Sequence, residues 1–227
     1  MANRRVLTWP NSKLIRVSTD VENFNEDLCD LANDLIDTLN VSMGAGLAAP
    51  QIGVNKRVVV IQCKTFGHEN PEPHDRNADA LILVNPVLET SGEMIQWSEA
   101  CLSIPGYEAK VSRRAQAIVK YQTLDGEERT LNAAWPLSGG LQHECDHLDG
   151  RLFTSRLSFY ERTSIEKKIV KRQRAQALVS REYNRKMRLE RKGIYDEEAY
   201  KKMTHGTGKR KKKKTKKQGK SYGKNKR

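Results

Sequence analysis

The run GLQHECDHLDG (140–150) constrains this chain more than any other feature, because it carries two histidines four residues apart. On an α-helix, residues at this spacing differ by about 40° in direction, so His143 and His147 project from one face. Glu144 lies about 100° round the helix from His143, close enough to handle the proton of a metal-bound water without being a ligand. The run therefore predicts a helix, beginning near Pro136, that can hold a catalytic metal ion.

A catalytic metal site needs a third protein ligand beside the two histidines. Cys145 points about 200° away from His143 on the helix, so we expect it in the core. Cys101, in the turn-like stretch WSEACLSIPG, is the better candidate, although a cysteine seen alone is more often a small buried hydrophobe. The alternative is that the two histidines and the glutamate are a coincidental match on a solvated helix face. Three carboxylates follow the histidines without forming a recognisable ligand pattern: Asp149, Glu161 and Glu166.

The other expected elements make an α+β protein, and two of the remaining cysteines fall on them. Cys29, on the apolar side of the first helix, and Cys63, at a strand end, are expected to be small buried side chains. A polar loop with two prolines is expected at 64–79. The elements are expected in this order: a helix at 26–40 capped by Asn25, strands at 57–62 and 81–89, a hairpin from residue 115 that turns at Asp125-Gly126, the metal-binding helix, and a weakly amphipathic basic helix at 160–192.

Charge divides the chain into an acidic body and a basic C-terminal third. Residues 1–155 carry a net charge of −7, residues 156–192 carry +9, and residues 205–227 carry +12 with no acidic residue. The last stretch is low in complexity and is expected to be disordered alone. We therefore expect a catalytic body at 1–158, a basic helical extension at 159–204 and a lysine-rich tail at 205–227.

No part of the sequence suggests a membrane or a secretory route. No apolar run approaches the roughly 18–20 residues that span a bilayer, and the N-terminus has no stretch like a signal sequence. We expect a soluble cytoplasmic protein without membrane contact. Its four cysteines are then expected to be free thiols or metal ligands rather than disulfides.

Three segments together resemble peptide deformylases in their order and approximate spacing: GAGLAAPQ (44–51), EACLS (99–103) and QHECDH (142–147). The resemblance extends from about Val6 to about Val170. It implies small antiparallel β-sheets around a central metal-binding helix, with the basic C-terminal helix packed outside. It also implies removal of the formyl group from the N-terminal formyl-methionine of nascent polypeptides, with release of formate.

The resemblance implies one divalent metal ion held by Cys101, His143 and His147, with water in the fourth position. Fe(II) is expected, and Zn, Ni or Co would also suit one sulfur and two nitrogen donors. Metal-bound water would attack the formyl carbon while Glu144 serves as general base and then as general acid.

The same resemblance assigns the groups that would surround the reacting carbon. The side-chain amide of Gln51 and the backbone N–H of Leu102 would stabilise the oxyanion. Gly46 would let the backbone approach the substrate, because no Cβ obstructs it. Glu99 and Arg113 are expected to form a supporting ion pair near this loop.

Ala100 departs from the family pattern, which usually has glycine at this position. If the backbone there has a positive φ, alanine imposes strain of roughly 1–2 kcal/mol. If it does not, the methyl group narrows the pocket beside the metal. Either change could alter activity or substrate choice.

Two other functions stay open from the sequence. A metalloprotease of the HExxH type would take its third ligand downstream of the histidines. A ribosome- or RNA-binding protein with an inactivated deformylase site would use the basic C-terminus, since runs of lysine bind phosphate backbones through counterion release. For an active enzyme, the same basic segments predict a tether to ribosomes.

Overall fold

The computed structural model describes residues 4–192, 196–197 and 201. The chain separates into two compact units, Met1–Gln173 and Arg174–Arg227. The lysine-rich tail at 205–227, which was expected to be disordered, lies outside the described residues, as does most of the stretch at 193–204.

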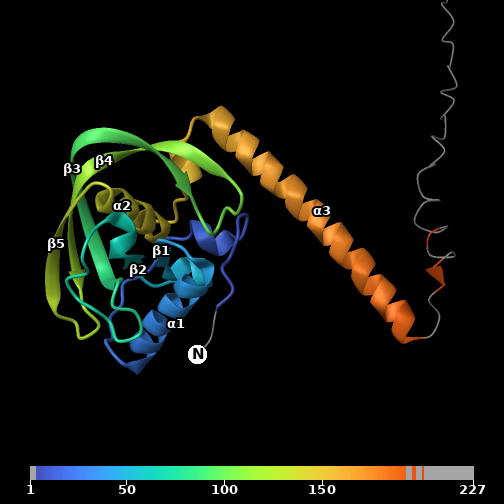
Figure 1. Ribbon diagram of the computed structural model, residues 1–227, viewed down its shortest axis with the longest axis horizontal. Helices are drawn as coiled ribbons and strands as arrows, with labels where there is room; N and C mark the ends of the chain where they lie inside the picture. The colour runs from blue at the N-terminus through green and yellow to red at the C-terminus, as the bar shows by residue number, and fades with distance from the viewer. Residues whose placement is uncertain (1–3, 193–195, 198–200, 202–227) are drawn as a thin grey trace, which may run out of the picture. The chain divides into compact units, whose positions relative to one another are not determined.

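Five strands form one antiparallel sheet in the order β1-β2-β3-β4-β5. The sheet is strongly curved and encloses the central helix α2, which contacts all five strands (Figure 1). This arrangement confirms an α+β fold with antiparallel sheet around the helix that carries the histidines. The strands are β1 (Gly46–Ala48), β2 (Val58–Gln62), β3 (Ala80–Ala100), β4 (Glu108–Gln122) and β5 (Glu128–Ala134).

Strand β2 is apolar from Val58 to Ile61 because both of its faces are covered. Val58 and Val60 pack in one core cluster with the buried face of helix α1 (Glu26–Ser42). Val59 and Ile61 point the other way and pack in a second cluster with residues of α2 (Leu137–Leu148), such as Leu141. A strand buried on both sides loses the usual alternation of apolar and polar residues.

Helix α1 begins where the sequence predicts and runs two residues further than the predicted end. Asn25 caps it, with the side-chain oxygen accepting a hydrogen bond from the Leu28 N–H at 3.3 Å. The prediction that Cys29 lies on the apolar side of this helix is wrong, because Cys29 is exposed. Leu28 is buried, and the next residue lies about 100° round the helix, which turns Cys29 toward solvent.

Strand β3 is much longer than the predicted strand at 81–89. Its second half pairs with β4 as far as Ala100, after a register shift between Ser91 and Met94. Every residue from Glu89 to Met94 is exposed, so the apolar pattern of the strand is interrupted there. The expected turn around Cys101 therefore begins at the cysteine itself, immediately after the strand.

The predicted hairpin and the two C-terminal helices are present. Strands β4 and β5 form the hairpin, and α2 follows Pro136, which occupies its N-cap position. Helix α3 spans Phe159–Arg191, and its buried residue Ile169 packs in a core cluster that also contains Cys101 and Ile104. From residue 174 to residue 192, no residue is buried. No helix in the described part of the chain is long and apolar enough to cross a membrane.

The short 3-10 helices connect these elements. Their bounds are η1 (Ser12–Ile15), η2 (Ala49–Ile52), η3 (Cys63–Phe66) and η4 (Phe153–Arg156). Of these, η2 directly follows β1 and η3 directly follows β2, and both help to position the site.

Candidate metal centre

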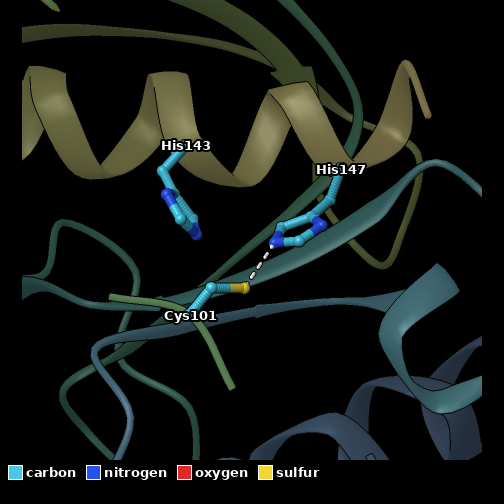
Figure 2. Close-up of side chains that lie close together, drawn as sticks. All are labelled: Cys101, His143 and His147. Atoms are coloured by element: carbon cyan, nitrogen blue, oxygen red, sulfur yellow. Dashed lines mark hydrogen bonds between the residues drawn. The ribbon is translucent and has the colours of Figure 1, made fainter. Parts of the chain in front are cut away.

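Cys101, His143 and His147 converge on one point, with one ligand atom from each within 4.8 Å of the others. Both histidines project from the same side of α2 toward Cys101, which follows the end of β3 (Figure 2). The Cys101 Sγ lies 3.2 Å from the Nε2 of His147. The structure thus brings together the three residues that the resemblance assigns to the metal.

The chemistry of this donor set fits a divalent transition metal. Burial by itself would raise the pKa of the Cys101 thiol, but the imidazoles of His147 and His143 lower it well below its ordinary value. The thiolate is the form that binds metal, and one thiolate with two imidazoles suits Fe(II), Zn(II), Co(II) or Ni(II). Among the described residues, no carboxylate joins this cluster. The downstream carboxylates that a metalloprotease would need are absent from it: Asp149, Glu161 and Glu166.

Glu144 lies beside the cluster with a carboxylate oxygen that has no hydrogen-bond partner. The residue is only 6% exposed, and its Oε2 is buried and unpaired. Burial raises the pKa of this carboxyl group. An unpaired buried oxygen is costly unless a group outside the protein satisfies it. The unpaired oxygen therefore fits a water or substrate atom at the metal.

Gly46 packs directly against Glu144. A Cβ at position 46 would lie 2.5 Å from the Glu144 Oε1 and 2.8 Å from its Cδ. The missing side chain at this residue of β1 therefore leaves the space that the Glu144 side chain occupies. The glycine was expected to make room for the substrate, and the structure adds this second constraint.

Gln51 precedes Cys101 in the sequence, whereas the two histidines follow it. Gln51 lies in the 3-10 helix η2. Its side-chain Oε1 accepts a hydrogen bond from the Ala48 N–H at 2.8 Å. Its Nε2 is 3.6 Å from the Cys101 Sγ and donates to the Ser103 Oγ at 3.2 Å. The carboxamide thus presents its N–H groups toward the metal cluster.

Glu99 fixes the ring of His143, and its expected ion pair with Arg113 is confirmed. The Glu99 carboxylate is 2.7 Å from the His143 Nδ1 and accepts hydrogen bonds from Arg113 at 2.6 and 2.9 Å and from Trp97 at 2.8 Å. Burial alone would raise the pKa of Glu99, but the hydrogen bonds from Arg113 and His143 lower it to about 2. Because Nδ1 is occupied by the carboxylate, Nε2 of His143 is left for the cluster.

Sequence reasoning missed the other half of this ion network. Arg113 also donates from Nη1 to the Asp146 Oδ2 at 2.5 Å, and Asp146 accepts from Arg156 at 2.6 and 2.7 Å. Arg113 is 1% exposed, so its charge depends on these two carboxylates. Arg113 stands at an inward position of β4, two residues after the buried Val111, and this spacing was the signal that could have predicted its burial.

A pocket of about 680 Å³ opens beside the cluster and is lined by residues of all three motifs. Ala100 contributes to its wall. The described non-glycine residues with positive φ are Met43 and Asn85, so Ala100 is not in the left-handed region. The alternative that Ala100 strains the backbone is therefore wrong, and the alternative that its methyl group narrows the pocket remains. The predicted residues that line the pocket are Gly46, Gln51, Cys101, Leu102, His143 and Glu144.

Comparisons with known proteins agree with this geometry. The family model described as polypeptide deformylase matches residues 3–163. A peptide deformylase of Acidobacterium capsulatum is 37% identical over 176 residues, which are 77% of this chain and 98% of that protein. One of Bartonella tribocorum is 38% identical over 173 residues, covering 76% of this chain and 94% of that protein.

Solved structures give the same result. The crystal structure of a peptide deformylase from Legionella pneumophila matches with a TM-score of 0.68 and 35% identity, covering 78% of this chain and 98% of that one. The peptide deformylase from Ehrlichia chaffeensis in complex with actinonin matches with a TM-score of 0.69 and 32% identity, covering 77% and 99%. The chain therefore belongs to the polypeptide deformylase family of metal-dependent hydrolases, which act on formyl-methionine peptides.

Proposed function

We propose that this protein removes the formyl group from the N-terminal formyl-methionine of nascent polypeptides and releases formate. The observation that carries the proposal is the unpaired Glu144 carboxylate beside three converging metal ligands. This combination supplies a base next to a site where water can be activated, which hydrolysis of an amide requires.

Cys101, His143 and His147 would hold the metal ion, which we propose to be Fe(II), with Zn, Ni or Co as alternatives. When bound, the ion lowers the pKa of water and polarises the formyl oxygen. The protein prepares its own side of the site by keeping Cys101 as a thiolate and by holding His143 through Glu99.

Glu144 would move the proton. Its unpaired Oε2 would accept a proton from the attacking water and later return it to the nitrogen of the departing amine. Burial supports this role, because a raised carboxyl pKa makes a stronger base.

The oxyanion donors would be the side-chain Nε2 of Gln51 and the backbone N–H of Leu102. Both residues line the pocket. Loss of one such donor typically costs about 2.7–4 kcal/mol of transition-state stabilisation. Gly46 lines the same wall, where the missing side chain would also leave the backbone open to an extended substrate.

Formate release from a formyl-Met peptide by anaerobically purified, Fe(II)-loaded protein tests this function. Turnover should disappear with Glu144→Ala and with the matching N-acetyl peptide. A metal-loaded protein that releases no formate would contradict the proposal. That result would favour the alternative of a ribosome- or RNA-binding protein with an inactivated site.

We also propose that residues 1–158 form the catalytic domain and that the basic extension at 159–204 and the tail at 205–227 contact ribosomes in the cytoplasm. The support is the lack of buried residues at 174–192 together with the strongly basic composition of this segment. Co-sedimentation with ribosomes should weaken as salt rises and should be weaker for a chain ending at residue 192. Equal binding of the two chains at physiological salt would exclude the tail from the contact.

A further inference from the structure

The Gln51 carboxamide can serve as an oxyanion donor only if its plane is held in place. Rotation about the last side-chain bond of glutamine is soft, because this torsion has broad and roughly two-fold minima. A half-turn would present Oε1 instead of Nε2 and would repel a developing negative charge. The residue is only 2% exposed, so protein atoms must fix the orientation.

Two hydrogen bonds hold the two ends of the amide. The Ala48 N–H donates to Oε1 at 2.8 Å, which requires the oxygen to face the backbone of β1. At the other end, Nε2 donates to the hydroxyl of Ser103 at 3.2 Å. One bond at each end defines the plane of the amide, and the second proton of Nε2 points to the Cys101 Sγ at 3.6 Å, a weaker hydrogen bond to an acceptor within the metal cluster.

Ser103 is itself rigidly placed. It is 0% exposed, and its carbonyl oxygen accepts a hydrogen bond from the Trp9 N–H at 2.9 Å. The N-terminal segment that provides this bond also donates from the Leu7 N–H to the Gln51 carbonyl at 2.7 Å. The backbones of Gln51 and Ser103 are therefore tied to one short segment, two residues apart along it.

We propose that Ser103 is a positioning residue for the reaction, acting through Gln51. Its hydroxyl anchors one proton of Nε2, so that the other, which faces Cys101, is directed at the metal cluster where the oxyanion would form. This inference rests on the proposed function, because Gln51 must stabilise an oxyanion for its orientation to affect the rate. Ser103 itself needs no contact with the substrate.

A double-mutant cycle on the Fe(II)-loaded full chain tests the rate effect. Ser103→Ala should lower kcat about tenfold with KM changed less than twofold, a smaller loss than the roughly 10²–10³-fold of a missing oxyanion donor. In the Gln51→Ala background, the same substitution should leave kcat unchanged, because the amide it positions is gone. A tenfold loss that persists in that background would overturn the proposal, as would an unchanged kcat for Ser103→Ala alone.

Ser138→Ala is the matched control. Ser138 is also 0% exposed, and its hydroxyl donates to the Ala115 carbonyl at 2.9 Å, so its removal costs a buried hydrogen bond without touching Gln51. This variant should lose stability but keep kcat. A comparable loss of kcat in both serine variants would mean that lost stability, rather than positioning, lowers the rate.

Side-chain amide NMR of Zn(II)-loaded protein tests the same inference without turnover. The two Gln51 N–H signals should shift and exchange faster with water in Ser103→Ala, and should stay unchanged in Ser138→Ala. Unchanged Gln51 signals in Ser103→Ala would overturn the positioning role. Absence of formate release by the wild-type protein would instead contradict the proposed function, and the NMR result would still decide whether Ser103 orients the Gln51 amide.

Discussion

Replacement of Gly46 by alanine should displace the proposed catalytic base. The new Cβ would lie 2.5, 2.8 and 2.9 Å from Oε1, Cδ and Cγ of Glu144, all closer than real Cβ contacts allow. The backbone at Gly46 does not have a positive φ, so alanine is tolerated there apart from this collision. Glu144 is buried and can give way only toward the pocket that it lines, and such overpacking costs about 1–3 kcal/mol.

Two measurements follow from this collision. The melting temperature should fall by roughly 2–12 °C, since about 1 kcal/mol corresponds to about 2–4 °C in a domain of this size. Formate release should lose on the order of 10²-fold in kcat, the cost of moving a reacting group by about 1 Å. KM should change less, because the substrate pocket keeps its other walls.

The cause can be isolated with Glu144→Ala, which removes all three of the atoms nearest the new methyl group. Gly46→Ala should cost at least about 1 kcal/mol less stability in the Glu144→Ala background than in the wild type. Gly44→Ala is the matched control, since the two nearest contacts of its Cβ would be side-chain ends, those of Leu102 and Leu39, both at 3.0 Å. Additive stability losses for Gly46→Ala and Glu144→Ala, within about 0.5 kcal/mol, would refute the collision as the cause.

Three further predictions concern the surroundings of the site. Arg113→Ala should lower the free energy of unfolding, measured in urea, by about 3–5 kcal/mol, because it leaves two buried carboxylates without their shared cation. A loss below about 1 kcal/mol would contradict this. Ala100→Gly should lower stability by about 0.5–1 kcal/mol, whereas a gain would mean that the alanine is strained after all. At pH 8, a thiol reagent should modify the exposed Cys29 of the metal-loaded protein but not Cys63 or Cys145. Burial raises the pKa of the Cys63 thiol to about 11 and that of the Cys145 thiol to about 12, so both stay protonated below these values. Removal of the metal by a chelator should add one reactive thiol, that of the third ligand, and an unchanged thiol count would argue against a cysteine ligand.

The sequence alone determined the features that depend on residues close together in the chain. The spacing of His143 and His147 placed them on one face, because helix geometry is the same in any fold. The cap at Asn25 and the apolar run of β2 likewise predicted their elements, since both signals are local. The order of the three motifs indicated the family before any geometry was available.

Only the tertiary structure decided which distant groups meet. Cys101 stands 42 positions before His143 in the sequence, and it reaches the histidines because β3 continues to Ala100 beyond the exposed stretch at 89–94. The bonds of Arg113 to two carboxylates follow from its inward position on β4, and burial makes such pairing necessary because an isolated charge in the core is too costly. Local spacing predicts the direction of a side chain, whereas long-range packing decides what that side chain contacts and how its pKa changes.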